Sequence, residues 1–336
     1  SAANTWVVNI HRDTVMIFQL VRSLTLDQVV VKALEGGIGD PPSREVVRAE
    51  EIERRDFGQD VPFLLEWTPS MVVTSDAGAG VGYTGMRIRG TDPTRINVTI
   101  NGIPLNDAES QNVFWVDLPD ILSSAQSVSI QRGVGTSTNG AAAFGASVDL
   151  RTNRFEMEPY ARIEGSVGSF NTRKASASFG TGLIGDHFTV DGRLSIIRSD
   201  GYVDRASADL RSYYVSANWV EDNWNLRYNV FSGSEITYQA WYGIPQEWLD
   251  DEDLRTQNPA GTEKPGEPYD DQVDDYTQTH HQLFFNYRVS EGWDLSLAGH
   301  YTKGFGFFEE YKSDQFLPDY GLSQTIIGGD TIPSND

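Results

Sequence analysis

The chain has 336 residues, of which 39% are hydrophobic and 22% are charged, a composition typical of folded protein and long enough for two domains. Its 48 acidic and 26 basic residues give a formal net charge of −22, which argues against nucleic acid as a partner because phosphate binding needs clustered lysines and arginines. The lack of cysteine excludes disulfides, thiolate metal sites and cysteine nucleophiles, and it is compatible with an oxidising envelope compartment.

The N-terminal region predicts short extended segments. Ser1–Trp6 shows no basic region followed by an apolar one, so no signal peptide is indicated. Residues 6–24 predict two short strands that resemble the tail of a longer unit. The β-branched run at residues 25–33 is followed by a glycine- and proline-rich linker at residues 36–42.

Residues 43–153 carry an α+β pattern. A helix is expected to start near Ser43, and a second is expected over residues 60–67 with Pro62 in its first turn. Asn101-Gly102 predicts a type I′ hairpin turn, because both central residues of that turn need positive φ. Strands are predicted at residues 86–89, 97–100, 103–105, 128–131 and 147–151.

Residues 154–336 change to strands of about ten residues, the length that lets a tilted strand cross a membrane. Leu194 and Ile196 share one face of residues 187–198, and Arg193 takes the other. No run of 18 apolar residues occurs, so no membrane helix is predicted and any span has to be part of a closed barrel. Seven strands are predicted, at residues 160–168, 172–180, 187–198, 211–219, 224–233, 279–289 and 293–303.

A soluble β-sandwich also alternates, but the loop lengths favour a membrane barrel. Short turns at residues 182–186, 221–223 and 290–292 alternate with longer connections at residues 199–209 and 238–277, as in outer-membrane barrels. Plugged transporter barrels have about 22 strands, so seven cannot close. The sequence therefore predicts an α+β plug domain and the first part of an antiparallel transmembrane β-barrel.

Four segments together resemble the plug of TonB-dependent receptors. They are MRIRGTDPTRINVTINGIPLND (residues 86–107), FWVDLP (114–119), VSIQRGVGTS (128–137) and AAAFGASVDL (141–150). The likeness is greatest to receptors of Bacteroidetes-type bacteria, where residues 202–205 and 238–241 also look familiar. The resemblance implies a plug at residues 43–153 inside a 22-stranded barrel that begins at residue 154. It also implies that residues 1–24 end a small β-sandwich domain.

The same resemblance implies a Ton box with its linker at residues 25–42, and a TonB-type periplasmic protein captures such a box to transmit energy. The matching residues are Leu26, Asp27, Gln28, Val29, Val30 and Val31. An extended β-branched segment can add as a strand to a partner's sheet edge, and the linker behind it lets it be pulled. A plain edge strand of the preceding domain is the alternative.

Two kinds of site follow from the resemblance. Arg89 and Arg132 match arginines that tie the family's plug to glutamates of the barrel wall, although each could instead be a solvated surface arginine. Plug loops at residues 75–84 and 106–115 are expected to meet the ligand, with Tyr83, Asn106, Glu109 and Trp115 as candidates. The glycine-rich loop lacks the lysine and the strand–loop–helix context of a phosphate cradle.

The remaining polar features predict no chemistry of their own. The acidic residues between 250 and 275 are expected to be a solvated loop, with calcium chelation as an alternative that no EF-hand spacing supports. His280 and His281 are adjacent in a strand and therefore point to opposite faces, which disfavours a joint metal site. No catalytic set was found, so no enzyme, metal or cofactor is predicted.

The predicted function is TonB-dependent import across the bacterial outer membrane, most commonly of an iron–siderophore complex within this family. Cobalamin, an oligosaccharide or a peptide are alternative cargoes, and a non-transporting surface or secretion-associated barrel is the rival class. Expected partners are the TonB-type protein, a small ligand such as a metal chelate, and outer-membrane lipids. Glycan importers of the family also use a surface lipoprotein, which the sequence does not indicate.

Overall fold

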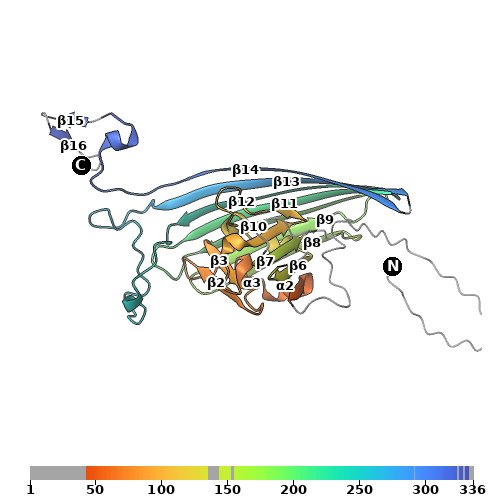
Figure 1. Cartoon of the computed structure of the whole chain (residues 1–336), viewed down its shortest axis with the longest axis horizontal. Coiled ribbons are helices and arrows are strands. Elements are labelled where there is room, and N and C mark those ends of the chain that lie inside the picture. Colours follow the sequence, from red (N-terminus) through yellow and green to blue (C-terminus); the bar gives the residue numbers. More distant parts are fainter. Residues whose placement is uncertain are drawn as a thin grey trace, which may run out of the picture.

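The computed structural model describes residues 43–134, 144–152, 155–290 and 292–323, and the backbone of two short strands beyond them. Within these residues a compact α+β region lies against one face of a long antiparallel sheet (Figure 1). The predicted Ton box and the residues before it lie outside the described part. None of the described helices has the length and apolar character needed to span a bilayer.

The α+β region is built on a five-stranded sheet in the order β1-β6-β7-β4-β5. Strands β4 and β7 run parallel and the other pairs run antiparallel. Ile88, Ile100, Ile130 and Leu150 are fully buried in the core of this region. The strands are β1 (Arg44–Arg48), β4 (Ile96–Ile100), β5 (Ile103–Pro104), β6 (Ser127–Arg132) and β7 (Ala146–Arg151).

The segment after Ser43 differs from the prediction of a helix. It forms β1 first, and helix α2 (Ala49–Arg55) begins only afterwards. Strand β1 pairs with β6 far along the chain, with Val47 opposite Val128, and this pairing overrides the local helical pattern. Helix α3 (Val61–Leu64) is where expected, with Pro62 in its first turn, but it is shorter than predicted.

Two hairpins shape the outer part of this region. Strands β2 (Met71–Ser75) and β3 (Thr84–Ile88) form one hairpin around the glycine-rich loop, and β2 was not predicted. The predicted turn at Asn101-Gly102 is confirmed, because φ is +55° and +80° at the two residues. This turn matters for the site because its Asn101 side chain is buried against the long sheet.

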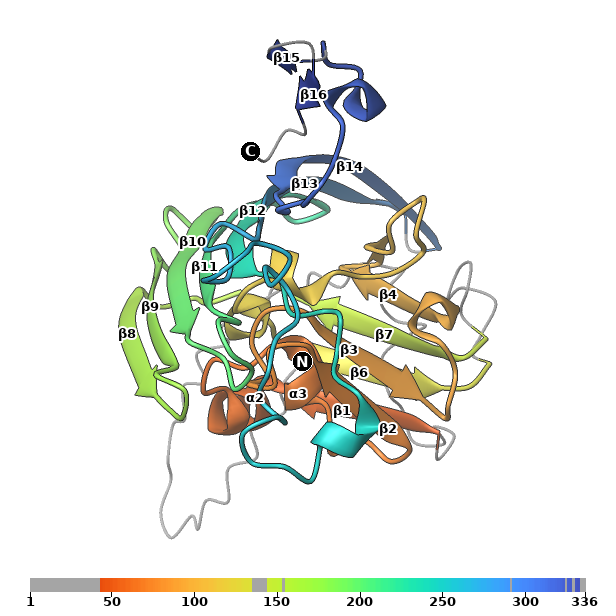
Figure 2. The same ribbon diagram turned by 90° about the vertical axis from the view of Figure 1, so that its left-hand side faces the viewer.

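The long sheet contains the seven predicted strands in sequence order (Figure 2). Each pairs only with its neighbours along the chain, so β8 and β14 are its edges and the sheet is open. Strand β13 begins at Val273, so Asp274 and Asp275 lie in a strand and not in the predicted acidic loop. The strands are β8 (Tyr160–Val167), β9 (Arg173–Gly180), β10 (Phe188–Ser199), β11 (Ala208–Val220), β12 (Trp224–Tyr238), β13 (Val273–Ser290) and β14 (Trp293–Phe308).

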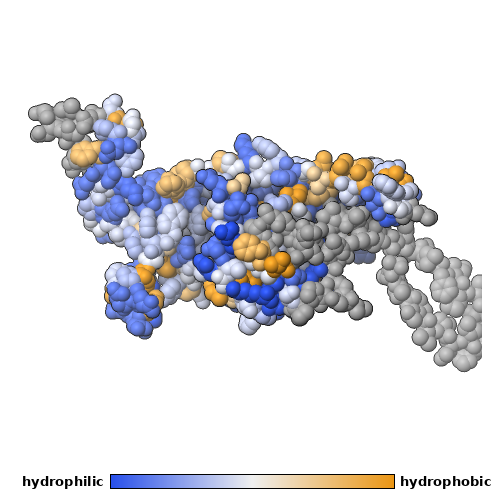
Figure 3. Space-filling model, viewed as in Figure 1, coloured by the Kyte–Doolittle hydropathy of each residue, from blue (hydrophilic) through white to orange (hydrophobic). Residues whose placement is uncertain are grey.

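The two faces of the long sheet differ as the alternation predicted. Leu194 and Leu297 are 65% and 57% exposed on the outer face, while Arg193 and Asn229 are buried on the face that meets the α+β region. Figure 3 shows hydrophobic residues gathered over the part of the sheet near its short turns. Apolar side chains facing away from the plug are what a lipid-facing barrel wall requires.

The long connections lie at the opposite end from the short turns at residues 181–187, at residues 221–223 and between β13 and β14, and the β8–β9 turn at residues 168–172 lies on their side. Because the strands are antiparallel, residues 200–207 and 239–272 share one end, where the glycine-rich loop of the α+β region also lies. The minor elements are η1 (Pro93–Arg95), η2 (Trp115–Asp117), η3 (Ile121–Ser124), η5 (Gln246–Trp248), η6 (Leu317–Tyr320), β15 (Thr325–Ile327) and β16 (Asp330–Ile332).

Candidate functional site

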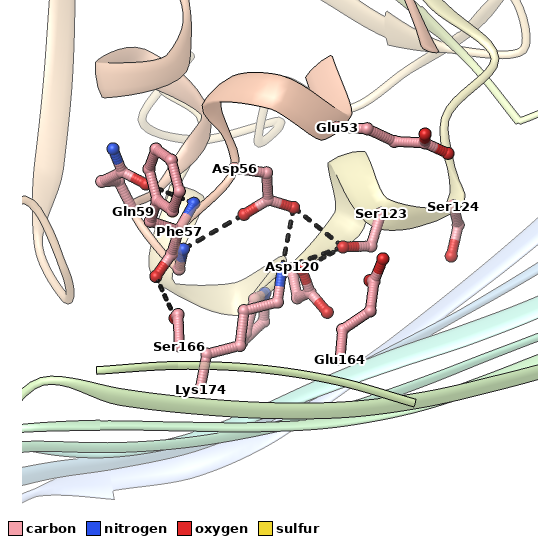
Figure 4. A network of polar contacts seen from close by, with 12 residues as sticks. Glu53, Asp56, Phe57, Gln59, Asp120, Ser123, Ser124, Glu164, Ser166 and Lys174 are labelled. Atoms are coloured by element: carbon pink, nitrogen blue, oxygen red, sulfur yellow. Dashed lines mark hydrogen bonds and ion pairs between the residues drawn. The ribbon is translucent and has the colours of Figure 1, made fainter. Parts of the chain in front are cut away.

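A buried ionic network joins the α+β region to the long sheet (Figure 4). Nζ of Lys174, on β9, lies 2.5 Å from Oδ1 of Asp120 and 2.8 Å from Oδ2 of Asp56. The guanidinium of Arg193, on β10, lies 2.8 Å from Oδ2 of Asp120. All four side chains are at most 7% exposed, so two cations of the sheet and two carboxylates of the α+β region neutralise one another away from water.

Local structure places Asp120 at the centre of this network. Asp120 has a left-handed backbone, with φ of +57°, and directly precedes η3. Ser123 and Ser124 of η3 complete the network, since Ser123 donates to Asp120 at 2.5 Å and Arg193 donates to Ser124 at 2.7 Å. Burial opposes ionisation of Asp120, but Arg193 and Lys174 outweigh it and hold the pKa of this carboxyl below its usual range.

A second charged contact crosses the same interface at its rim. Arg162 of β8 lies 2.8 Å from Glu53 of α2, and the two side chains are 43% and 42% exposed. Open cavities of about 390 and 410 Å³ flank the network, and Arg162 lines both of them. The rim pair is therefore open to water, whereas Lys174, Asp56 and Arg193 of the network border these cavities with side chains that are at most 7% exposed.

Neutral hydrogen bonds hold the Asn101 hairpin to the sheet. Nδ2 of Asn101 donates to Oε1 of Gln282 on β13 at 3.0 Å and to the hydroxyl of Thr152 at 2.9 Å. Gln282 donates in return to the carbonyl of Ile100 at 3.2 Å, and Tyr214 donates to the Thr152 hydroxyl at 2.9 Å. These groups are buried, so leaving any of them unpaired would be costly.

The glycine-rich loop touches the long connections of the sheet. The backbone N–H groups of Tyr202 and Val203 donate to the carbonyl of Ala77 at 2.8 and 3.1 Å. Gly78 has φ of +69°, and a Cβ atom there would lie 3.0 Å from the ring of Tyr202. Only glycine combines this backbone with so close an approach.

Tyr83, a predicted ligand contact, lies at the end of this loop against the sheet. Its hydroxyl donates to Asp274 and lies 3.4 Å from Glu235, and its ring meets Trp241 edge-on at 5.6 Å. Burial, followed by the negative charge of Glu235 and Asp274, raises the pKa of Tyr83 above its ordinary value. Tyr83 therefore stays a hydrogen-bond donor at neutral pH.

The other three predicted ligand contacts are not gathered around Tyr83. Trp115 is 3% exposed inside the hydrophobic core. Asn106 bridges backbone groups, accepting from Val98 at 2.8 Å and donating to Ile96 at 2.9 Å, while Glu109 is exposed. In this structure Trp115 and Asn106 support their loop from within, and a ligand role for them stays a prediction.

The predicted lock residues Arg89 and Arg132 lie next to each other. Arg89 has φ of +53° and is exposed, and its Nη1 atom lies 2.7 Å from where a Cβ of Gly133 would be. Arg132 donates to the carbonyl of Pro69 at 3.3 Å. The structure thus brings the Arg89 side chain next to Gly133, the residue after Arg132, and the glutamate partners of both arginines remain a prediction.

A partly open antiparallel barrel wall with an α+β domain docked on its inner, polar face defines a plugged outer-membrane β-barrel. The comparisons agree with this class. The family model of the TonB-dependent Receptor Plug Domain matches residues 39–147. The chain therefore contains the plug domain of a TonB-dependent outer-membrane receptor together with seven strands of its barrel, located in the outer membrane.

Individual relatives are distant. The ferric enterobactin receptor PirA of Pseudomonas aeruginosa is 23% identical over 164 residues, which are 46% of this chain and 22% of that protein. The siderophore receptor PirA from Acinetobacter baumannii matches with a TM-score of 0.57 and 14% identity, over 78% of this chain and 40% of its own. The ferric-catecholate import receptor Fiu from E. coli K12 matches with a TM-score of 0.61 and 15% identity, over 78% of this chain and 38% of its own. The chain thus spans at most about two fifths of these three relatives.

These findings settle several predictions. The receptor family and the fold class are confirmed, and because the family consists of transporters the prediction that the chain is not an enzyme is confirmed as well. The likeness to Bacteroidetes-type receptors stays a prediction. The Asp120 network was missed by sequence reasoning, although the inward position of Arg193 in the middle of a strand is a signal that a buried partner must exist.

Proposed function

We propose that the receptor containing this chain imports a ferric–siderophore complex across the outer membrane. A TonB-type periplasmic protein supplies the energy by pulling on the segment Leu26–Val31. The relatives support the cargo, since the three named above are siderophore, ferric enterobactin or ferric-catecholate receptors. The observation that carries the mechanism is the buried ionic network that joins plug and barrel wall.

The network explains why the plug would need an external pull. Removing one partner from a buried ion pair costs about 3–5 kcal/mol, because the other charge is left desolvated. Lys174 and Arg193 would both lose Asp120 if the plug moved away from the wall. The neutral contacts of Asn101 and Gln282 add to this barrier. Spontaneous opening would therefore be rare, and the passage would open mainly under traction.

The outer end of the plug offers a way for a ligand to affect both parts at once. Tyr83 contacts the barrel residues Glu235, Asp274 and Trp241, and the loop before it contacts Tyr202. A ligand that rearranges this loop would change plug–wall contacts directly. Such coupling requires that the ligand bind the two arrangements with different affinity.

The test is energy-dependent uptake of ⁵⁵Fe-labelled chelates by intact cells that carry the full receptor. Replacing Leu26–Val31 by a glycine–serine segment of equal length should abolish uptake while leaving chelate binding at the cell surface unchanged. The matched control replaces Val7–Arg12 in the same way and should retain uptake. Uptake that survives the first replacement and still stops when the proton gradient is collapsed would refute the proposed coupling. A native receptor that takes up none of the catecholate, hydroxamate or citrate-type chelates would refute the proposed cargo.

A further inference from the structure

Three carboxylates from separate elements interact electrostatically at the outer end of the plug–wall interface, where Asp117 packs at Gly233 of β12, two residues before Glu235. Asp117 comes from η2 of the plug, Glu235 from β12 and Asp274 from the start of β13. The hydroxyl of Tyr83 contacts the carboxylates of both Glu235 and Asp274. Asp117 and Glu235 are 6% and 1% exposed, whereas Asp274 is only half-buried.

No positively charged side chain in the described part of the protein pairs with this acidic cluster. Among the described residues no lysine or arginine forms an ion pair with Asp117, Glu235 or Asp274, in contrast to Asp120. Oδ1 of Asp117 is buried without a hydrogen-bond partner there. Burial and the charge of Asp274 raise the pKa of Asp117 to about 7. A buried carboxyl of this kind is either protonated or stabilised by a bound cation, and a cation at this position would favour the ionised form.

Two observations indicate what could bind there. The described residues contain no group of three histidine, cysteine, aspartate or glutamate side chains arranged to hold a metal ion, so these three carboxylates do not form a metal-ligand set. Aromatic rings adjoin the carboxylates instead, because Trp241 packs edge-on against Tyr83 and is 38% exposed. Carboxylates combined with aromatic faces are the chemistry that recognises an ammonium group, through charge-assisted hydrogen bonds and cation–π contact.

We propose that Asp117, Glu235 and Asp274, with Tyr83 and Trp241, bind a positively charged amine of the imported ligand. The amine enters from the outer side past Trp241 and Asp274, and Asp117 and Glu235 form the floor of the site. The amine supplies a positive charge to the carboxylates, and it contacts the plug and the wall at the same time. The inference rests on the proposed import function and adds the charge of the cargo.

The rest of the outer surface is consistent with a cationic cargo. The connection between β12 and β13 carries the acidic run Asp250–Asp253, whose four residues are exposed. The chain as a whole has a net charge of −22. Negative potential around a binding cleft raises the local concentration of cations and disfavours anionic chelates.

The experiment compares two forms of one probe on the purified full receptor in detergent. The probe is a linear ferric trihydroxamate with a free terminal ammonium, and its partner is the same chelate with that amine acetylated. We expect the ammonium form to bind at least tenfold more tightly to the native receptor. Asp117→Asn and Asp274→Asn should each remove most of this preference while leaving binding of the acetylated form unchanged. Asp186→Asn, which removes an exposed carboxyl from a short turn at the other end, is the control and should keep the preference.

The outcomes separate this inference from the proposed function. Equal binding of the two forms would overturn it, as would binding of neither form by a receptor that takes up other ferric chelates. A preference that survives both substitutions would also overturn the assignment to these carboxylates. If either variant fails to fold, Trp241→Leu in the exposed rim provides the test and should weaken only the ammonium form. A receptor that takes up no ferric chelate would instead refute the import function.

Discussion

Asp120→Asn is the substitution that probes the plug–wall interface most sharply. It keeps the size of the side chain and one acceptor oxygen, but it removes the charge that Lys174 and Arg193 share at 2.5 and 2.8 Å. Lys174 retains Asp56, whereas Arg193 loses its carboxylate partner in this network. Removing one partner of a buried pair costs about 3–5 kcal/mol. With one acceptor left we expect about 3 kcal/mol, which is roughly a hundredfold change in an opening equilibrium.

Hydrogen–deuterium exchange of the full receptor in detergent can measure this change. The amides of Tyr202 and Val203 in the wall, which donate to the plug carbonyl of Ala77, should exchange about a hundredfold faster in Asp120→Asn, because they lose this acceptor when the plug leaves the wall. The matched control is Arg162→Gln, which breaks the 43%-exposed pair with Glu53 across the same interface. That pair should be worth less than about 1 kcal/mol. Equal effects of the two variants would refute the view that burial makes the Asp120 network decisive.

Three further predictions concern the plug and its contacts with the wall. Burial raises the pKa of Asp60 from 3.8 to about 7, so the folded plug holds a proton that the unfolded chain has lost, and stability falls as the pH rises from about 4 to 7. Asp117 contributes in the same direction, so Asp60→Asn should reduce the loss of stability between pH 5 and pH 8 without abolishing it, as measured by thermal unfolding. Gln282→Leu should cost about 1–3 kcal/mol by the same unfolding assay, because it removes the bonds to Asn101 and Ile100, and an unchanged melting temperature would contradict this. Gly78→Ala should speed hydrogen–deuterium exchange of the Tyr202 and Val203 amides, because a Cβ atom at φ of +69° is strained and would lie 3.0 Å from the Tyr202 ring. Unchanged protection of these amides would contradict the prediction.

The barrel strands were predictable from sequence because their environment repeats every two residues. Leu194 and Arg193 lie on opposite faces as the alternation indicated, and all seven predicted strands exist. The start of β13 was missed because Asp274 and Asp275 read as part of an acidic loop. Their place in the strand depends on pairing with Thr237 and Ile236 of β12, which local composition does not encode.

The plug was predictable where a turn fixes local geometry and less so where distant pairing decides. The Asn101-Gly102 turn determines one hairpin locally, whereas β1 forms by pairing with β6, which lies far along the chain. The ionic network could not be predicted in full from the sequence for a similar reason. Asp120, Lys174 and Arg193 come from three separate segments, and nothing in the spacing of these residues reports that they meet.

A reversible tether between plug and wall tests most directly whether the two must separate during import. The chain has no cysteine, so Gly82→Cys with Ala208→Cys would introduce the chain's one disulfide. A Cβ at Gly82 would lie 3.9 Å from that of Ala208, close to the usual disulfide value of about 3.8 Å. Gly82→Cys alone controls for the strain of a side chain at φ of +98°. We expect ⁵⁵Fe–chelate uptake to stop in the oxidised double variant and to return on reduction, with surface binding unchanged. Equal uptake in the oxidised and reduced states would contradict the account.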